Sequence, residues 1–219
     1  GNLPKLEMKV GIAGYGVVGK TRHASIQKNT PYKVIAISEA NPQAQKNIPP
    51  EIDIFDDYRD LISKAELDII FISLPNKFAS DAVSLSLKNG LHIFCEKPPA
   101  KTLDELIQVK EIYNKCSNSK LMYGFNHRFH LSVEEAKSII DSNTLGKIIN
   151  LKGVYGKSQM ISFNQTDWRT KREESGGGIL LDQGIHMLDL IRYLSGESFS
   201  QIFSFIDNAF WNFDVEDNA

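Results

Sequence analysis

The first 125 residues alternate between short apolar runs and longer amphipathic segments. Apolar runs rich in β-branched residues predict buried strands at 8–13, 33–38, 68–74, 91–95 and 121–125. Helices are expected between them, at 18–28, 58–64, 76–89 and from the Thr102–Glu105 capping box onward, with at most a short strand in 41–57. Near-continuous apolar strands that alternate with helices form a parallel sheet covered on both faces. The pattern predicts an α/β fold with a doubly wound parallel sheet.

After residue 122 the pattern changes, and we expect a domain boundary there, with domains at 1–122 and 123–219. The second half mixes long polar stretches, such as 158–175, with fewer regular segments. Helices are expected at 132–142, opened by a capping box at Ser132, and at 178–194, and strands at 147–155, 201–206 and 209–215.

The ends of the chain suggest a piece of a longer protein. Gly1 precedes Met8, which looks like a natural start, and the tail reaches Ala219 without a terminating turn. We therefore expect an incomplete second sheet whose apolar face meets water and promotes self-association. Its aromatic residues are Phe203, Phe205, Phe210, Trp211 and Phe213.

Composition narrows the class of protein. Hydrophobic residues make up 42% of the chain, which is enough for a sizeable core, and the net charge is only −2. No basic patch predicts a nucleic-acid or membrane-surface partner, and no apolar run approaches the ~20 residues of a membrane span. The two cysteines, Cys95 and Cys116, give neither a disulfide framework nor a zinc motif. We expect a cytoplasmic protein without a metal.

Eight of the fifteen glycines lie in two short stretches, and the first stretch has the spacing G-x-G-x-x-G. It follows the strand at 8–13 and opens a helix, which is the context of a dinucleotide-binding turn. There, backbone comes close to a pyrophosphate at the helix N-terminus. The alternative is a glycine-rich turn that binds nothing. The turn consists of Gly14, Gly16, Val17, Val18 and Gly19.

Glu39 ends the second strand, 20 residues after Gly19. A carboxylate at this place hydrogen-bonds the adenosine ribose hydroxyls of a dinucleotide. It would repel a 2′-phosphate, so NAD is favoured over NADP.

Glu96-Lys97-Pro98 ends the strand at 91–95, at the edge where ligands of open α/β sheets bind. A partly desolvated lysine there is suited to proton transfer beside a nicotinamide and a substrate hydroxyl. The alternative is a surface lysine before a loop.

Asp182 and His186 lie four residues apart in the helix expected at 178–194, so they share one face. A carboxylate one turn before an imidazole can orient it and raise its basicity. The alternative is a buried structural histidine bonded by the aspartate of its own helix.

Together these residues resemble the Gfo/Idh/MocA family of NAD(P)-dependent oxidoreductases (glucose–fructose oxidoreductase and inositol dehydrogenase relatives). The resemblance covers nearly the whole chain. It includes GIAGYGVVG (11–19), Glu39, Leu74-Pro75-Asn76, Glu96-Lys97-Pro98, Asn126-His-Arg128-Phe129, Trp168-Arg169 and GGGILLDQGIH (176–186). One departure is Ala79, where many members have a histidine three residues after the Pro-Asn pair.

The resemblance implies a Rossmann domain followed by an α+β domain with an open, largely antiparallel sheet. It implies Lys97, Asp182 and His186 as catalytic residues, with His186 taking a hydroxyl proton and Lys97 polarising the oxygen. Leu74, Pro75, Asn76 and Glu96 would join the cofactor site. The substrate would be a sugar, a sugar derivative or a nucleotide sugar, and the protein a homo-oligomer formed through the second-domain sheet.

Three further residues are candidates for substrate contact. Arg128 is either a structural charge or a substrate-positioning one, and Trp168-Arg169 offers an aromatic platform with a guanidinium, or a loop held by its tryptophan. His127 and His130 lack the carboxylate or cysteine partners of a metal site.

Two other functions stay open: a non-catalytic relative that senses a dinucleotide and binds a protein, and an NAD-dependent glycosidase or lyase without net redox change.

Overall fold

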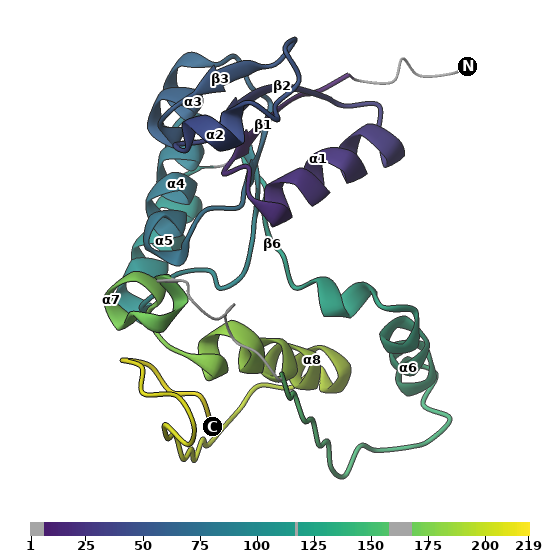
Figure 1. Cartoon of the computed structure of the whole chain (residues 1–219). Coiled ribbons are helices and arrows are strands. Elements are labelled where there is room, and N and C mark those ends of the chain that lie inside the picture. Colours follow the sequence, from purple (N-terminus) through teal and green to yellow (C-terminus); the bar gives the residue numbers. More distant parts are fainter. Residues whose placement is uncertain (1–6, 117, 158–167) are drawn as a thin grey trace, which may run out of the picture. The chain divides into compact units, whose positions relative to one another are not determined.

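The computed structural model describes residues 7–116, 118–157 and 168–219 (Figure 1). By its internal contacts the chain divides into two compact units, Gly1–Gly124 and Phe125–Ala219. The division falls two residues after the boundary expected from the sequence pattern. The expected polar stretch 158–175 lies partly outside the described residues.

The first unit contains a six-stranded sheet in which every neighbouring pair is parallel. Its order is β3-β2-β1-β4-β5-β6, which is the doubly wound order of a Rossmann fold and confirms the expected fold class. The strands are β1 (Lys9–Ala13), β2 (Lys33–Ser38), β3 (Asp53–Phe55), β4 (Ile69–Ile72), β5 (His92–Cys95) and β6 (Leu121–Tyr123).

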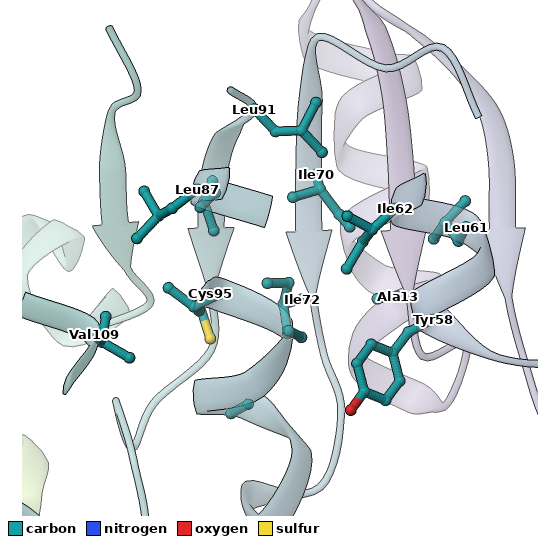
Figure 2. Close-up of a cluster of buried hydrophobic side chains, with 14 of the residues drawn as sticks. Ala13, Tyr58, Leu61, Ile62, Ile70, Ile72, Leu87, Leu91, Cys95 and Val109 are labelled. Carbon is teal, nitrogen blue, oxygen red and sulfur yellow. The ribbon is translucent and has the colours of Figure 1, made fainter. Parts of the chain in front are cut away.

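Helices cover both faces of this sheet, because its strands are apolar on both sides. In β1, Val10 and Ile12 pack with Ile26 of α1 (Val17–Asn29) in one core cluster. Ala13 belongs to the opposite cluster. That cluster is formed with α3 (Tyr58–Lys64), α4 (Asn76–Lys88) and α5 (Leu103–Lys115), and Figure 2 shows Leu61, Ile70, Ile72, Leu87, Cys95 and Val109 within it. A single turn, α2 (Pro42–Gln45), follows β2.

Side-chain capping explains the start of α5 but not that of α4. Thr102 caps α5 as expected, since its hydroxyl accepts the Glu105 N–H at 3.3 Å. In the helix expected at 76–89, an asparagine at the first position could cap the N-terminus, but Asn76 is the first helical residue of α4 and Pro75 precedes it as the cap, with no side-chain hydrogen bond. Proline at this position fixes the extended backbone from which the helix begins.

The second unit is built from short helices and irregular chain. Its longer helices are α6 (Leu131–Asp141) and α8 (Ile185–Ser195). The expected helix at 178–194 is present as a π-helical turn, Leu180–Gly184, that leads into α8. Ser132 does not cap α6, because the helix begins one residue earlier and His130 precedes it. The remaining elements are 3₁₀ turns at Asn126–Phe129 and Trp168–Thr170 and the single turn α7 (Arg172–Ser175).

The strands expected at 147–155, 201–206 and 209–215 are not formed in the described residues. A strand needs a neighbouring strand to accept its hydrogen bonds, and in the described part of this unit the one antiparallel pairing outside named strands is the bridge between Asp207 and Asn218. The N–H groups of residues 209–211 instead donate to the Asp217 carboxylate. These bonds lower the pKa of Asp217, and the bond from the Trp211 N–H contributes most.

The aromatic tail is exposed where its sequence pattern predicts an uncovered apolar face. The side chains of Phe203, Phe205 and Phe210 are 89%, 93% and 81% exposed. Trp211 and Phe213 are half-buried, because they stack on each other with ring centroids 5.5 Å apart.

Candidate functional site

Four residues that follow strands form a row at the carboxyl edge of the sheet. Each donates its backbone N–H to the last carbonyl of the neighbouring strand, so the pairing of the strands fixes its position. The bonds join Glu39 to Phe55 (2.9 Å), Gly14 to Ser38 (3.0 Å), Ser73 to Ala13 (2.8 Å) and Glu96 to Ile72 (2.9 Å). This is the edge where ligands of open α/β sheets bind.

The three glycines of the expected dinucleotide turn have different structural roles. Gly14 has φ +89°, and an added Cβ would lie 2.6 Å from the Ser73 carbonyl oxygen. A Cβ on Gly19 would lie 2.1 Å from the Gly14 oxygen, so this glycine lets α1 pack on the turn. A Cβ on Gly16 would meet nothing within 4 Å. The backbone at Gly16 is therefore open to a ligand.

Helix α1 begins directly after Gly16, and no side chain caps it. Val17 and Val18, in its first turn, are exposed. The first N–H groups of the helix and its partial positive charge are thus directed at the open side of the turn, as phosphate binding requires.

Glu39 is held by two backbone N–H groups. Its Oε2 accepts from Tyr15 at 3.1 Å and its Oε1 accepts from Asn41 at 2.9 Å. One of these donors lies inside the glycine turn, so the carboxylate is fixed beside the place where a dinucleotide would pass. The remaining lone pairs of both oxygens are available to ribose hydroxyls.

Tyr15 and His23 stabilise the glycine turn from its buried side, and neither is among the site residues predicted from the sequence. The Tyr15 hydroxyl lies 2.8 Å from His23 Nδ1, and both side chains are buried. Burial lowers the pKa of His23 and raises that of Tyr15. A signal was present, because His23 lies between Gly19 and Ile26 at the spacing of the buried helix face.

Leu74, Pro75 and Asn76 connect β4 to α4 at the same edge. Leu74 packs against the core cluster and lies next to Gly14, where an added Cβ would be 3.3 Å from its side chain. Asn76 is buried in the first turn of α4. The segment therefore adjoins the glycine turn, as a cofactor-contacting role requires.

Glu96 forms an ion pair with Arg22, a residue that was not predicted from the sequence to lie at the site. Arg22 Nε and Nη2, from α1, both lie 2.6 Å from Glu96 Oε1. The guanidinium lies over the Phe94 ring at 4.8 Å. Gly124 leaves room on the other side, since a Cβ there would lie 2.7 Å from Glu96 Oε2. The carboxylate is thus oriented by α1, and the half-buried Lys97 follows it directly at the sheet edge.

In the second unit, His186 is buried among aromatic rings. Its imidazole stacks on that of His127, with centroids 3.9 Å apart and planes inclined by 20°. Phe125 meets it edge-on at 6.4 Å and Tyr155 lies at 6.3 Å. Asp182, one turn earlier and half-buried, accepts the Gln183 side-chain amide at 2.8 Å. The expected pair is thus on one helical segment, and His127 is a neighbour that its sequence spacing does not reveal.

The sequence leaves open whether Arg128 is a structural charge or a substrate-positioning one, and its contacts favour the structural role. It forms a two-pronged ion pair with Asp189, its Nε lying 2.8 Å from Oδ2 and its Nη2 close to Oδ1. The bond to Asp189 raises the pKa of Arg128. The guanidinium also lies over the Tyr193 ring at 5.1 Å.

Trp168 and Arg169 form the expected combination of ring and charge. They share a 3₁₀ turn, and the guanidinium lies over the indole at 4.5 Å. In the described ranges, no three histidine, cysteine or acidic side chains gather as metal ligands would, and no helix is long and apolar enough to cross a membrane.

Comparison with known proteins agrees with this geometry. Residues 8–125 match the oxidoreductase family with an NAD-binding Rossmann fold, and residues 133–219 match the GFO/IDH/MocA C-terminal domain. The chain is 29% identical over 197 residues to D-glucoside 3-dehydrogenase of Escherichia coli K12, covering 86% of this chain and 54% of that protein. It is 28% identical over 206 residues to levoglucosan dehydrogenase of Pseudarthrobacter phenanthrenivorans, covering 87% and 52%. The chain spans about half the length of the curated relatives it matches.

Solved structures give the same picture. Levoglucosan dehydrogenase in complex with NADH and levoglucosan is similar with a TM-score of 0.79 and 27% identity, over 87% of this chain and 55% of that one. The WlbA dehydrogenase of Bordetella pertussis, with NADH and UDP-GlcNAcA, has a TM-score of 0.85 over 99% of this chain and 63% of that one, and at 18% identity it shows the fold alone. With family matches in both halves and a glycine turn at the carboxyl edge of its sheet, the chain belongs to the GFO/IDH/MocA family of oxidoreductases.

Proposed function

We propose that this protein is an NAD-dependent oxidoreductase that acts on a secondary hydroxyl of a sugar, a sugar derivative or a nucleotide sugar. The observation that carries the proposal is the carboxyl edge of the sheet. Three features follow three strands of one sheet there. They are the open backbone at Gly16, the oriented carboxylate of Glu39, and Lys97. The dehydrogenases named above, which act on glucosides and levoglucosan, support the substrate class.

The residues of the first unit fit a dinucleotide. Gly14, Gly16 and Gly19 give a turn without side chains, and α1 directs its uncapped N-terminus at it. Val17 and Val18 would line the phosphate position, and Leu74, Pro75, Asn76 and Glu96 the part of the cofactor nearer Lys97. When bound, the nicotinamide supplies the hydride acceptor or donor.

Glu39 makes NAD the expected cofactor. Both of its oxygens already receive backbone N–H groups, which fixes the orientation of the carboxylate. It can accept from two ribose hydroxyls, whereas a 2′-phosphate would bring a second negative charge against it. NADP is therefore expected to bind less tightly.

Lys97, Asp182 and His186 are the proposed catalytic residues. His186 takes the proton of the substrate hydroxyl as general base, and Asp182, on the same helical segment, stabilises the imidazolium. Lys97 donates a hydrogen bond to the substrate oxygen and stabilises negative charge that develops there. Trp168 and Arg169 are proposed to contact the sugar, whereas the Asp189 pair of Arg128 limits that residue to positioning.

Self-association is proposed to use the exposed aromatic tail. Phe203, Phe205 and Phe210 are large apolar side chains that are exposed to water in the second unit. Sedimentation velocity of the protein and of the triple variant with serine at these positions tests this, and equal sedimentation coefficients would refute it.

Turnover of variants tests the proposed catalysis. On a substrate found by screening sugars and nucleotide sugars for NADH absorbance, Lys97→Ala and His186→Ala should each lower kcat by ~10²-fold or more. NAD affinity should change little. Lys88→Ala, an exposed lysine at the end of α4, is the matched control.

Wild-type turnover in either catalytic variant would remove that residue from the mechanism. If the protein retains NAD and converts substrate without net NADH, the redox-neutral alternative holds instead. If NAD binds and no panel member reacts, the non-catalytic alternative holds.

A further inference from the structure

Glu216 is a buried carboxylate that the proposed mechanism does not use. The residue is only 8% exposed, although it lies three residues before Ala219. Oε1 accepts the backbone N–H of Gly178 at 2.9 Å and that of Leu180 at 3.3 Å. Its own carbonyl accepts the Ile179 N–H at 2.9 Å. One tail residue thus satisfies three successive N–H groups at the start of the helical segment.

The glycines of the turn before that segment make this contact possible. A Cβ on Gly178 would lie 1.9 Å from the Glu216 carbonyl oxygen, so any larger residue would push the tail away. Gly176 has φ +85°, which lets α7 end and the chain reverse. The close approach of the tail backbone thus explains why small residues are needed in this turn.

The charge of Glu216 suits its place. The N–H groups at a helix start carry a partial positive charge, and an anion there is stabilised. Arg172, in α7, lies 3.6 Å from the second oxygen, Oε2. The carboxylate is therefore compensated on both sides, by the helix start and by a guanidinium.

The segment held in this way carries the proposed catalytic pair. The Asp182 N–H donates to the Gly178 carbonyl at 2.9 Å, so the residue bound by Glu216 also bears the first turn that contains Asp182. His186 follows one turn later, after the π-helical turn. π-Helical turns of this kind are rare and frequently lie at functional sites.

We propose that Glu216 is a positioning residue that sets the register of Asp182 and His186 by capping residues 178–180 from the tail. The inference rests on the proposed function, which gives those two residues their role. It predicts that loss of Glu216 lowers turnover through the geometry of the imidazole, while the dinucleotide turn of the first unit is unaffected.

The test compares Glu216→Ala and Glu216→Gln with Asp214→Asn in the intact protein. Asp214 is the matched control, because it lies on the same tail and its carboxylate accepts the N–H of Arg172, at the start of α7, at 3.0 Å. Three quantities are measured: amide hydrogen exchange of Gly178 and Leu180, the NMR signals of the His186 ring, and kcat with the dissociation constant of NAD.

In Glu216→Ala, exchange of the Gly178 and Leu180 amides should accelerate by ~10-fold or more, since both lose the side-chain oxygen that accepts them. The His186 ring signals should move, and kcat should fall roughly 10- to 100-fold, as expected when a reacting group is displaced. NAD affinity should stay within about two-fold, as the general base does not bind it. Glu216→Gln keeps an acceptor oxygen and should recover most of both properties. Asp214→Asn should behave as wild type.

Two results would overturn the proposal. In one, amide exchange in Glu216→Ala stays at the wild-type rate. In the other, exchange accelerates while the His186 signals and kcat do not change, which would make Glu216 a structural cap alone. If the wild-type protein turns over no substrate, the proposed function fails, and the exchange and ring signals still decide the positioning role.

Discussion

Replacing Gly16 and Gly19 by alanine, one at a time, separates cofactor binding from folding. The two glycines lie three residues apart in the same turn, and the added atom is one methyl carbon in both. At Gly16 that carbon meets nothing within 4 Å, whereas at Gly19 it would lie 2.1 Å from the Gly14 carbonyl oxygen. The same chemical change should therefore destabilise the folded chain at Gly19 and leave its stability nearly unchanged at Gly16.

The magnitudes follow from these distances. Relief of the Gly19 contact requires backbone to move by about 1 Å, and overpacking of this kind costs about 1–3 kcal/mol. At Gly16, φ is −70° and ψ is −163°, which alanine adopts freely, so stability should change by less than about 1 kcal/mol. Its methyl group would instead occupy the space a phosphate needs, and NAD affinity should fall roughly 10- to 100-fold, or about 1.4–2.8 kcal/mol.

Urea unfolding and NAD titration on both variants provide the assay. Gly16→Ala should unfold at the wild-type midpoint and bind NAD weakly, and Gly19→Ala should lose both stability and binding. Wild-type NAD affinity in Gly16→Ala would refute the assignment of this turn to the cofactor. Wild-type stability in Gly19→Ala would refute the packing argument.

The remaining predictions concern single side chains of the first unit. Glu39→Ala should weaken NAD several-fold and reduce the preference over NADP in parallel titrations, and tighter NADP binding by the wild type would contradict the role of Glu39. Arg22→Met should lower the free energy of unfolding by about 1–3 kcal/mol, because it leaves Glu96 charged and partly buried, and Arg22→Met/Glu96→Gln should recover part of it in urea melts. Folding lowers the pKa of His23 from 6.5, so below that pH the unfolded chain binds more protons. The free energy of unfolding should therefore fall as the pH drops below about 6.5, a slope that His23→Gln should reduce; equal slopes between about pH 5 and 8 would exclude His23 as its source.

Local signals in the sequence predicted most of the first unit. The strand at 33–38 and the helix at 58–64 coincide with β2 and α3, since apolar runs and short-range caps determine both. The glycine turn was predictable for the same reason, as its requirement for small residues is local. The family resemblance is confirmed by matches over both halves.

Contacts between distant residues were not predictable. Arg22 and Glu96 are 74 positions apart, and Gly178 and Glu216 are 38 apart, so no spacing rule connects them. The strands expected at 201–206 and 209–215 failed for a related reason. Alternating residues indicate which faces a strand would have, but a strand forms only where another strand accepts its hydrogen bonds.

The buried ring of Tyr15 has a consequence for how a dinucleotide would bind. The residue between the first two glycines is tied to His23 through its hydroxyl and to Glu39 through its N–H. A flexible glycine-rich loop loses much conformational entropy when a ligand orders it. Here most of that ordering has already happened during folding. Association should therefore proceed without a slow rearrangement, and binding should leave the hydrogen exchange of the Tyr15 amide, which already donates to Glu39, nearly unchanged.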